Sequence, residues 1–144
     1  MEKSKKVIIY TDGGARGNPG PAAIGVVMGE KHFAEQIGKA TNNVAEYSAV
    51  TFALKKAKQL LGKEKAKQSI IEIRSDSELI VRQMNGIYKI KESALIPFFI
   101  EAWNAKQDFG KVSFVEIPRE ENKIADCLVN ETLDGKGKNS TLFG

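Results

Sequence analysis

The sequence predicts one α/β domain built on a mixed β-sheet, and three observations support this. The chain has 144 residues, the size of one ordinary domain, and 42% of them are hydrophobic. That composition is enough for a core without disulfides or metals as staples. Strand-like and helix-like segments alternate, with three strands first and strand–helix units afterwards, and this order favours a mixed sheet covered by helices.

The first part of the chain predicts three strands. The apolar run at residues 6–11 forms the first, and a loop rich in glycine and proline follows at residues 12–21. Residues 22–28 and 32–37 form the next two, joined by a tight turn at residues 29–30. These segments supply the beginning of the sheet.

The clearest helix lies at residues 44–61, and Gly62 ends it. Apolar side chains recur there at spacings of three and four, which predicts a buried stripe. The stripe consists of Tyr47, Val50, Leu54, Ala57 and Leu61.

The rest of the chain continues as strands and helices within the same domain, residues 1–144. We predict strands at residues 69–74 and 112–117, and helices at residues 77–84, 93–106 and 124–133. In the second of these helices, Leu95, Phe99 and Ala102 are expected to face the core. The tail from about residue 135 is expected to be loose.

The composition limits the chemistry that this chain could perform. Its 22 Lys+Arg and 18 Asp+Glu give a net charge of +4, which permits a polyanionic partner without requiring one. The single cysteine, Cys127, excludes a disulfide framework and a Cys-based zinc site, and we expect it to pack in the core. The single histidine, His32, excludes multi-histidine metal sites. Carboxylates are therefore the obvious reagents.

No targeting signal is expected from the sequence. The apolar run near the N-terminus is too short for a signal peptide, and no run approaches the roughly 20 apolar residues of a membrane span. We therefore expect a cytoplasmic protein with no membrane partner.

Four carboxylates fall at strand ends or helix starts. Asp12 and Asp76 each follow an apolar strand, so parallel pairing of those strands would place both at the carboxyl edge of the sheet. Glu46 and Asp126 lie in the first turns of two helices. Clustered carboxylates repel one another and need a cation, and their hard oxygen atoms suit Mg²⁺ or Mn²⁺.

Each carboxylate also has a purely structural interpretation. Asp76 could cap the helix that follows it, and Glu46 could close a capping box with Asn43. Asp126 could favour the positive end of its helix dipole, and Asp12 could be a turn residue. Capping and turn formation do not require all four carboxylates to gather at one edge of the sheet. Their predicted gathering at that edge therefore favours a metal site.

Four segments of the chain resemble the type 1 ribonuclease H family, in order and across essentially its whole length. They are YTDGGARGNPGPAAIG (10–25), TNNVAEY (41–47), IRSDSELIVRQMNG (73–86) and PREENKIADCLVNE (118–131). The resemblance implies a ribonuclease H-like fold, a five-stranded mixed sheet with its first three strands antiparallel and with flanking helices. It also implies endonucleolytic hydrolysis of the RNA strand of an RNA–DNA hybrid, leaving 5′-phosphate and 3′-hydroxyl ends.

The same resemblance assigns the metal ligands. It implies that Asp12, Glu46, Asp76 and Asp126 hold two Mg²⁺ ions, for which Mn²⁺ can substitute. Asp12 would bridge the two ions. Asp126 would help to hold the ion that activates the attacking water, and Glu46 and Asp76 would help to hold the ion on the leaving-group side.

The resemblance also implies contacts to the hybrid, with the glycine-rich loop and Glu46 sensing the 2′-hydroxyl groups of RNA. The implied contact residues are Gly13, Gly14, Arg16, Asn18, Lys39, Thr41, Asn42 and Asn43. Structural alternatives stay open for some of them. Asn18 could be a turn former before Pro19, and the two adjacent asparagines could cap the following helix. Lys39 lies where the family often has arginine.

The chain departs from many family members in the loop before the last carboxylate. This loop, residues 118–122, is short and has no histidine, which resembles a branch found in archaea and some bacteria. Arg119 could supply positive charge near the scissile phosphate, and its alternative is a salt bridge with Glu120. The basic protrusion of some bacterial members is absent or vestigial, because only residues 87–92 remain there.

Two other functions stay open at this point. One is a non-catalytic module that binds hybrid or double-stranded RNA, which the retention of all four carboxylates disfavours. The other is a metal nuclease acting on DNA, such as a junction resolvase or transposase core, which the 2′-hydroxyl-sensing loop disfavours. We expect a monomer, and double-stranded RNA remains open as a second substrate.

Overall fold

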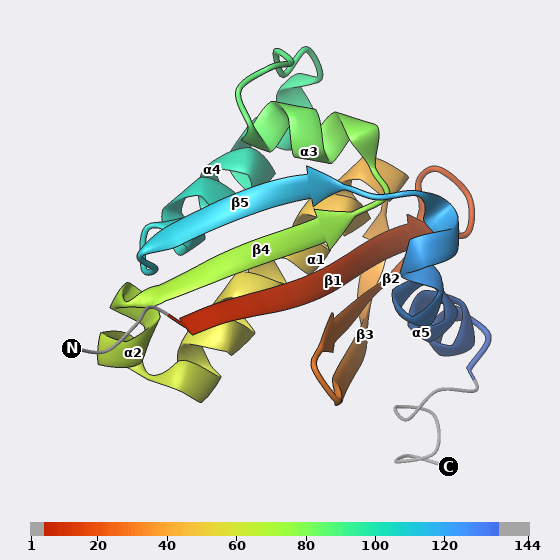
Figure 1. Ribbon diagram of the computed structural model, residues 1–144. Coiled ribbons are helices and arrows are strands. Elements are labelled where there is room, and N and C mark those ends of the chain that lie inside the picture. Colours follow the sequence, from red (N-terminus) through yellow and green to blue (C-terminus); the bar gives the residue numbers. More distant parts are fainter. Residues whose placement is uncertain (1–4, 136–144) are drawn as a thin grey trace.

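The computed structural model describes residues 5–135, which form a five-stranded sheet in the order β3-β2-β1-β4-β5 (Figure 1). The strands are β1 (Lys5–Ala15), β2 (Gly20–Met28), β3 (Lys31–Ala40), β4 (Ser69–Ser75) and β5 (Lys111–Glu116). β1 pairs antiparallel with β2, and β2 antiparallel with β3, whereas β4 lies parallel to β1 and to β5. The predicted fold class is confirmed, including the three antiparallel strands at the start.

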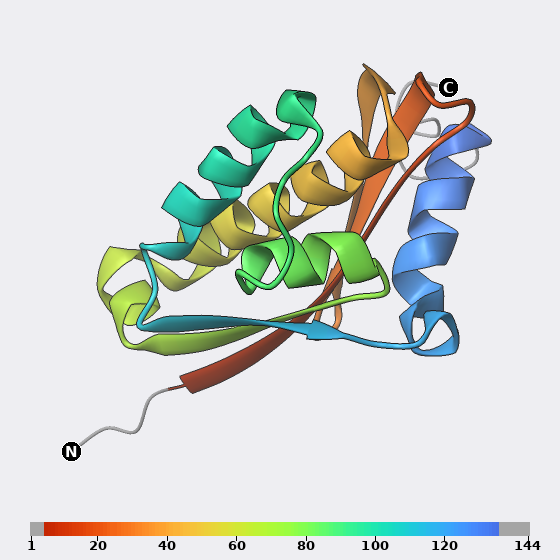
Figure 2. The same cartoon turned by 90° about the horizontal axis from the view of Figure 1, so that it is seen from above.

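Helices cover both faces of this sheet. They are α1 (Asn42–Leu61), α2 (Lys63–Lys67), α3 (Glu78–Met84), α4 (Ile96–Lys106) and α5 (Lys123–Leu133), with 3₁₀ turns at Ser93–Leu95 and Arg119–Asn122. Figure 2 shows α1, α3 and α4 on one side of the twisted sheet and α5 on the other. None of the helices within residues 5–135 is long and apolar enough to cross a membrane.

The elements differ from the sequence prediction mainly at their ends. β1 runs on to Ala15, because Gly13 and Gly14 continue the pairing with β2, so the predicted loop at residues 12–21 is much shorter. The predicted helix at residues 93–106 begins as a 3₁₀ turn, and α4 starts where Pro97 can occupy the first turn without losing a helical hydrogen bond. The short helix α2 was not predicted. Apart from Gly135, the predicted loose tail lies outside the described residues.

The buried stripe of the long helix is confirmed. Tyr47, Val50, Leu54 and Ala57 are at most 1% exposed, and Leu61 is half-buried. They pack in one hydrophobic cluster with strand residues from β1, β2, β4 and β5 and with α3 and α4. On the α4 side, Leu95 and Ala102 are buried and Phe99 is half-buried. This core holds the strands that carry the candidate site.

The prediction that Cys127 packs in the core is wrong, because its side chain is exposed. The buried residues of α5 are Ala125, Val129 and Thr132, spaced by four and three. Cys127 lies two positions after Ala125, which is a rotation of about 200° around the helix and turns the thiol to solvent. Its sulfur lies 3.3 Å from a carboxylate oxygen of Glu131.

Two leucines on α1 allow a direct test of this packing. Leu54 is fully buried and Leu60 is 48% exposed. We predict that Leu54→Ala lowers the free energy of unfolding by about 2–5 kcal/mol, whereas Leu60→Ala changes it by less than about 1 kcal/mol. Urea denaturation monitored by circular dichroism measures both. Similar losses for the two variants would contradict the orientation of α1.

Candidate active site

The pairing of β1 with β4 brings Asp12 and Asp76 to the same level at the carboxyl edge of the sheet. The parallel register ends at Tyr10 and Arg74, and each aspartate lies two residues further on. The arrowheads of β1, β4 and β5 point to the same end of the sheet, where α5 begins (Figure 1). Asp12 is only 6% exposed and lies inside β1, so the turn interpretation of this residue is wrong.

A close backbone approach joins β1 to the start of α1. A Cβ atom at Gly13 would lie 2.3 Å from the carbonyl carbon of Ala45, a distance that no larger residue could accept. The Gly13 N–H donates a hydrogen bond of 3.1 Å to Oε1 of Glu46. The capping-box interpretation of Glu46 is therefore wrong, since Thr41 caps α1 by accepting from the N–H of Val44.

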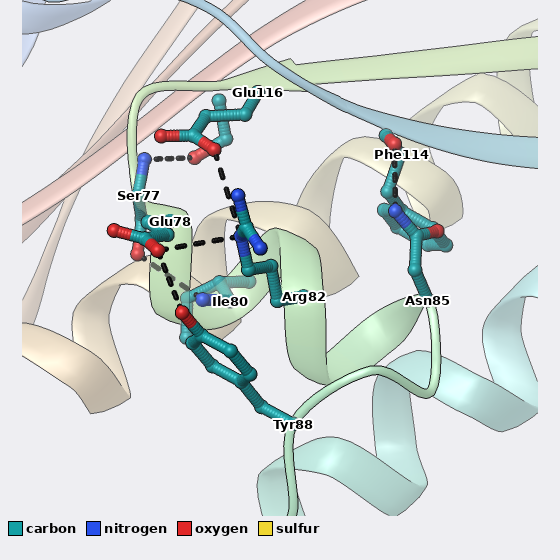
Figure 3. Close-up of polar contacts among 9 residues, drawn as sticks. Ser77, Glu78, Ile80, Arg82, Asn85, Tyr88, Phe114 and Glu116 are labelled. Atoms are coloured by element: carbon teal, nitrogen blue, oxygen red, sulfur yellow. Dashed lines mark hydrogen bonds and ion pairs between the residues drawn. The ribbon is translucent and has the colours of Figure 1, made fainter.

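Two serines fix the backbone on either side of Asp76. The Ser77 N–H donates to the hydroxyl oxygen of Ser75, and the Ile80 N–H donates to the hydroxyl oxygen of Ser77 (Figure 3). Ser77 is thus the residue that caps α3, and the capping interpretation of Asp76 is wrong. The Asp76 carboxylate is therefore not used for capping and can take part in the acidic cluster.

A second close approach positions α5. A Cβ atom at Gly25, which pairs with Asp12 across the sheet, would lie 2.4 Å from the carbonyl oxygen of Ala125. The absence of a side chain there lets α5 press against β2. Asp126, the next residue, lies in the first turn of the helix, as predicted, and is placed beside Asp12.

The structure brings three of the four predicted carboxylates into one cluster. One carboxylate oxygen from each of Asp12, Glu46 and Asp76 lies within 4.8 Å of the others, a spacing that fits a shared divalent cation. Asp126 is not part of this mutually close group. It lies beside Asp12 and helps to raise the pKa of that carboxyl group.

Burial and mutual repulsion make these carboxyl groups reluctant to ionise. Burial, followed by the charges of Asp76 and Asp126, raises the pKa of Asp12 to about 8. Burial, followed by the charges of Asp12 and Asp76, also raises the pKa of Glu46. The pKa of Asp76 is raised by burial, against the opposing effects of a hydrogen bond from Asn122 and the charge of Arg119. A bound cation would offset the repulsion between these carboxylates.

Arg119 lies where its charge reaches the cluster. Its guanidinium favours the ionised forms of Glu46 and Asp76 and so partly offsets the rise in the pKa of each. Its side chain is exposed and, within the described part of the chain, forms no ion pair with Glu120 or any other acid. The salt-bridge alternative therefore finds no support.

The loop between β1 and β2 is tied to the start of α1 by side-chain hydrogen bonds. The Ala15 N–H donates to Oδ1 of Asn42 at 2.8 Å, and the Asn42 N–H donates to Oδ1 of Asn18 at 3.0 Å. These bonds bring Asn18 and Asn42 together at the start of α1, the helix that carries Glu46.

The other predicted contact residues differ in their surroundings. Arg16 is exposed and pairs with Asp134 at 2.6 Å, so binding a phosphate would require this surface ion pair to open. Lys39 lies exposed on β3, opposite Pro21. Asn43 is half-buried in the first turn of α1, and His32 is exposed in the β3 strand.

Comparisons with known proteins agree with this architecture. A family model described as reverse transcriptase-like matches residues 10–132. Ribonuclease HI of Halobacterium salinarum is 36% identical over 139 residues, which cover 92% of this chain and 67% of that protein. The crystal structure of its RNase H1 matches with a TM-score of 0.81 and covers 90% of this chain and 98% of the other.

The chain belongs to the type 1 ribonuclease H family. A further solved member, LC11-RNase H1 isolated from compost and crystallised with an RNA/DNA hybrid, is 47% identical. It has a TM-score of 0.83 and covers 89% of this chain and 96% of the other. A bifunctional protein of Mycobacterium tuberculosis is 35% identical over 94% of this chain, and the match spans 37% of the length of that protein.

Membership of the ribonuclease H family gives the acidic cluster a chemical context. The family depends on divalent metal ions, and within residues 5–135 the group formed by Asp12, Glu46 and Asp76 is the one that fits such an ion. Sequence reasoning missed two residues that build this site. Gly25 had a usable signal, because glycine inside a strand marks a close backbone approach, and Asn122 resembled an ordinary helix cap.

The raised pKa values predict an unusual dependence of stability on pH. An acid whose pKa is higher in the folded protein stabilises the fold fully below its unfolded pKa of about 4. That contribution is lost as the pH rises through the folded pKa, which for Asp12 is about 8. Metal-free protein should therefore melt at least about 5 °C lower at pH 8 than at pH 5.

Differential scanning calorimetry in EDTA measures this dependence, with Asp12→Asn as the control. The control should flatten the profile, because asparagine is neutral at every pH. Divalent ions should restore the melting temperature of the unaltered protein at pH 8. A metal-free melting temperature that rises from pH 5 to pH 8 would contradict the assignment of buried, repelling carboxyl groups.

Proposed function

We propose that this protein is an endonuclease that hydrolyses the RNA strand of RNA–DNA hybrids with the help of two divalent metal ions. The observation that carries the proposal is the convergence of Asp12, Glu46 and Asp76, with Asp126 alongside, in a ribonuclease H fold. Further support comes from the compost RNase H1, a relative that was crystallised with an RNA/DNA hybrid.

The proposed metal ligands are Asp12, Glu46, Asp76 and Asp126, and they fit Mg²⁺, with Mn²⁺ as a substitute. All four offer hard carboxylate oxygens, and burial, with repulsion between the carboxylates, raises the pKa values of three of them. Bound divalent ions would supply an activated water and stabilisation of the leaving alkoxide, giving 5′-phosphate and 3′-hydroxyl ends.

The chain itself would contribute rigidity, charge balance and recognition. Burial raises the pKa of Asp12 to about 8, so this carboxyl group would give up a proton when a cation binds. Gly13 is buried against the start of α1 and Gly14 is half-buried. Both are proposed to let the backbone approach the RNA strand, where a 2′-hydroxyl group would be sensed. Asn18, Lys39, Thr41, Asn42 and Asn43, with Arg16, are proposed to contact the hybrid.

The assembly and setting of the protein also remain proposals. This chain spans only 37% of the length of the mycobacterial relative, so the activities of that whole protein are not assigned to this chain. We propose a monomer that acts in the cytoplasm. Double-stranded RNA is a further substrate to be tested beside the hybrid.

A side-by-side cleavage assay tests the function. Labelled RNA–DNA hybrid, double-stranded RNA and double-stranded DNA would be incubated with Mg²⁺ or Mn²⁺, and the products resolved by strand and end group. We predict cleavage of the RNA strand of the hybrid and complete loss in EDTA. Asp76→Asn should reduce cleavage by at least about a thousandfold while the protein remains folded and binds hybrid.

Several outcomes would overturn the proposal. Binding of hybrid without cleavage by the unaltered protein would indicate a non-catalytic module, and cleavage of double-stranded DNA would indicate a DNA nuclease. Cleavage that continues in the presence of a chelator would show that the mechanism does not need metal ions.

Arg119 allows a separate kinetic test. If its guanidinium acts on charge that develops in the transition state, Arg119→Ala should lower kcat by about tenfold or more and change KM by less than about threefold. Arg119→Lys keeps the charge and should retain more of the activity. Steady-state kinetics on a short hybrid measures all three proteins. Unchanged kinetics in Arg119→Ala would show that this residue has no part in turnover.

A further inference from the structure

Asn122 lies where three elements that carry carboxylates meet. It is the residue just before α5, the helix that carries Asp126. Its Nδ2 donates a hydrogen bond of 2.9 Å to the carbonyl oxygen of Thr11, the residue before Asp12 in β1. Its side-chain amide also lies near enough to the Asp76 carboxylate, just after β4, to act against the rise in the pKa of that carboxyl group. One side chain therefore lies at the meeting point of α5, β1 and the start of the β4–α3 connection.

Asn122 does not cap α5, although it stands where a capping residue is expected. Asn122 occupies the N-cap position of α5, where asparagine normally accepts a hydrogen bond from the N–H of the first helical turn. Its side chain makes no such capping bond. It is instead 1% exposed and turned inward to β1. Capping of α5 therefore does not explain why an asparagine stands here.

The other half of the amide gives a second, independent observation. Oδ1 of Asn122 is buried and has no hydrogen-bond partner among residues 5–135. Exchanging the positions of the amide oxygen and nitrogen would not give the oxygen a donor, because it would then face the carbonyl oxygen of Thr11. A buried acceptor without a donor destabilises a fold, and an apolar side chain would avoid that cost. The benefit of Asn122 must lie in what its Nδ2 holds in place.

We propose that Asn122 is a positioning residue of the active site, holding Asp12 on β1 and Asp76 after β4 in fixed relation to Asp126 on α5. This inference rests on the proposed function, because the groups that it positions are the proposed metal ligands. A carboxylate that accepts a hydrogen bond from a fixed donor keeps one orientation, and such outer contacts commonly tune metal affinity by about 10- to 100-fold.

The test uses Asn122→Leu, which is close to asparagine in size and removes both the Nδ2 donor and the unpaired Oδ1. The first readout is the affinity for Mn²⁺ alone, measured by isothermal titration calorimetry without nucleic acid. We expect it to fall by about tenfold or more. The second is hydrolysis of hybrid at saturating Mn²⁺, where kcat should fall while KM changes by less than about threefold. A merely structural role would change the melting temperature without changing either readout.

Asn85 supplies a matched control. Its Nδ2 donates a hydrogen bond of 3.0 Å to the carbonyl oxygen of Phe114, so it also ties a helix end to a neighbouring strand (Figure 3). Asn85 lies at the end of α3 that points away from Asp76. Asn85→Leu breaks the same type of bond and should leave Mn²⁺ affinity and kcat within about twofold of the unaltered protein.

The outcomes are distinguishable. Mn²⁺ affinity unchanged in Asn122→Leu, or lowered equally in Asn85→Leu, would overturn the positioning role even if the unaltered protein cleaves hybrid. Failure of the unaltered protein to cleave any hybrid would overturn the proposed function, while the Mn²⁺ comparison would still decide the role of Asn122. If Asn122→Leu does not fold, as judged by circular dichroism, Asn122→Ala takes its place with the same expectations.

Discussion

The repulsion between one buried and two half-buried carboxyl groups is the constraint on which the rest of this structure depends. Asp12, Glu46 and Asp76 are held within 4.8 Å of one another, and burial raises the pKa of each. Such a cluster opposes folding unless protons or cations neutralise it. The apolar core formed by α1, α3, α4 and the sheet has to offset that cost. A folded core that holds carboxylates together against their repulsion provides a site that a divalent cation can occupy.

Backbone contacts, more than side-chain packing, set the geometry of the cluster. Gly13 lets the first turn of α1 touch β1, and Gly25 lets the first turn of α5 touch β2. Both helices therefore begin at the carboxyl edge of the sheet, where the parallel pairing of β1 and β4 has already placed two aspartates. The site thus depends on the edge of a sheet and on two helix starts, which are rigid elements. Rigid elements hold ligands more accurately than loops do.

The sequence predicted the sheet, its main helices and the four carboxylates, because each depends on a short local pattern. The stripe of α1 follows from helical spacing, and Asp12 and Asp76 follow from the ends of apolar runs. The exposure of Cys127 was not predictable in this way, because it depends on which face of α5 meets β2. The inward turn of Asn122 was equally hidden, since a residue before a helix is expected to cap it. Contacts between distant segments decide such cases.

The most direct test of the account is a crystal structure of the Asp76→Asn variant with an uncleaved RNA–DNA hybrid and Mn²⁺, using anomalous scattering to locate the metal. We expect the variant to keep the shape of the site while cleaving more slowly. The account predicts anomalous peaks beside Asp12, with the RNA strand over the cluster and Arg119 facing a phosphate of that strand. A hybrid bound with its DNA strand over the cluster, or Mn²⁺ bound only away from these carboxylates, would contradict the central claim.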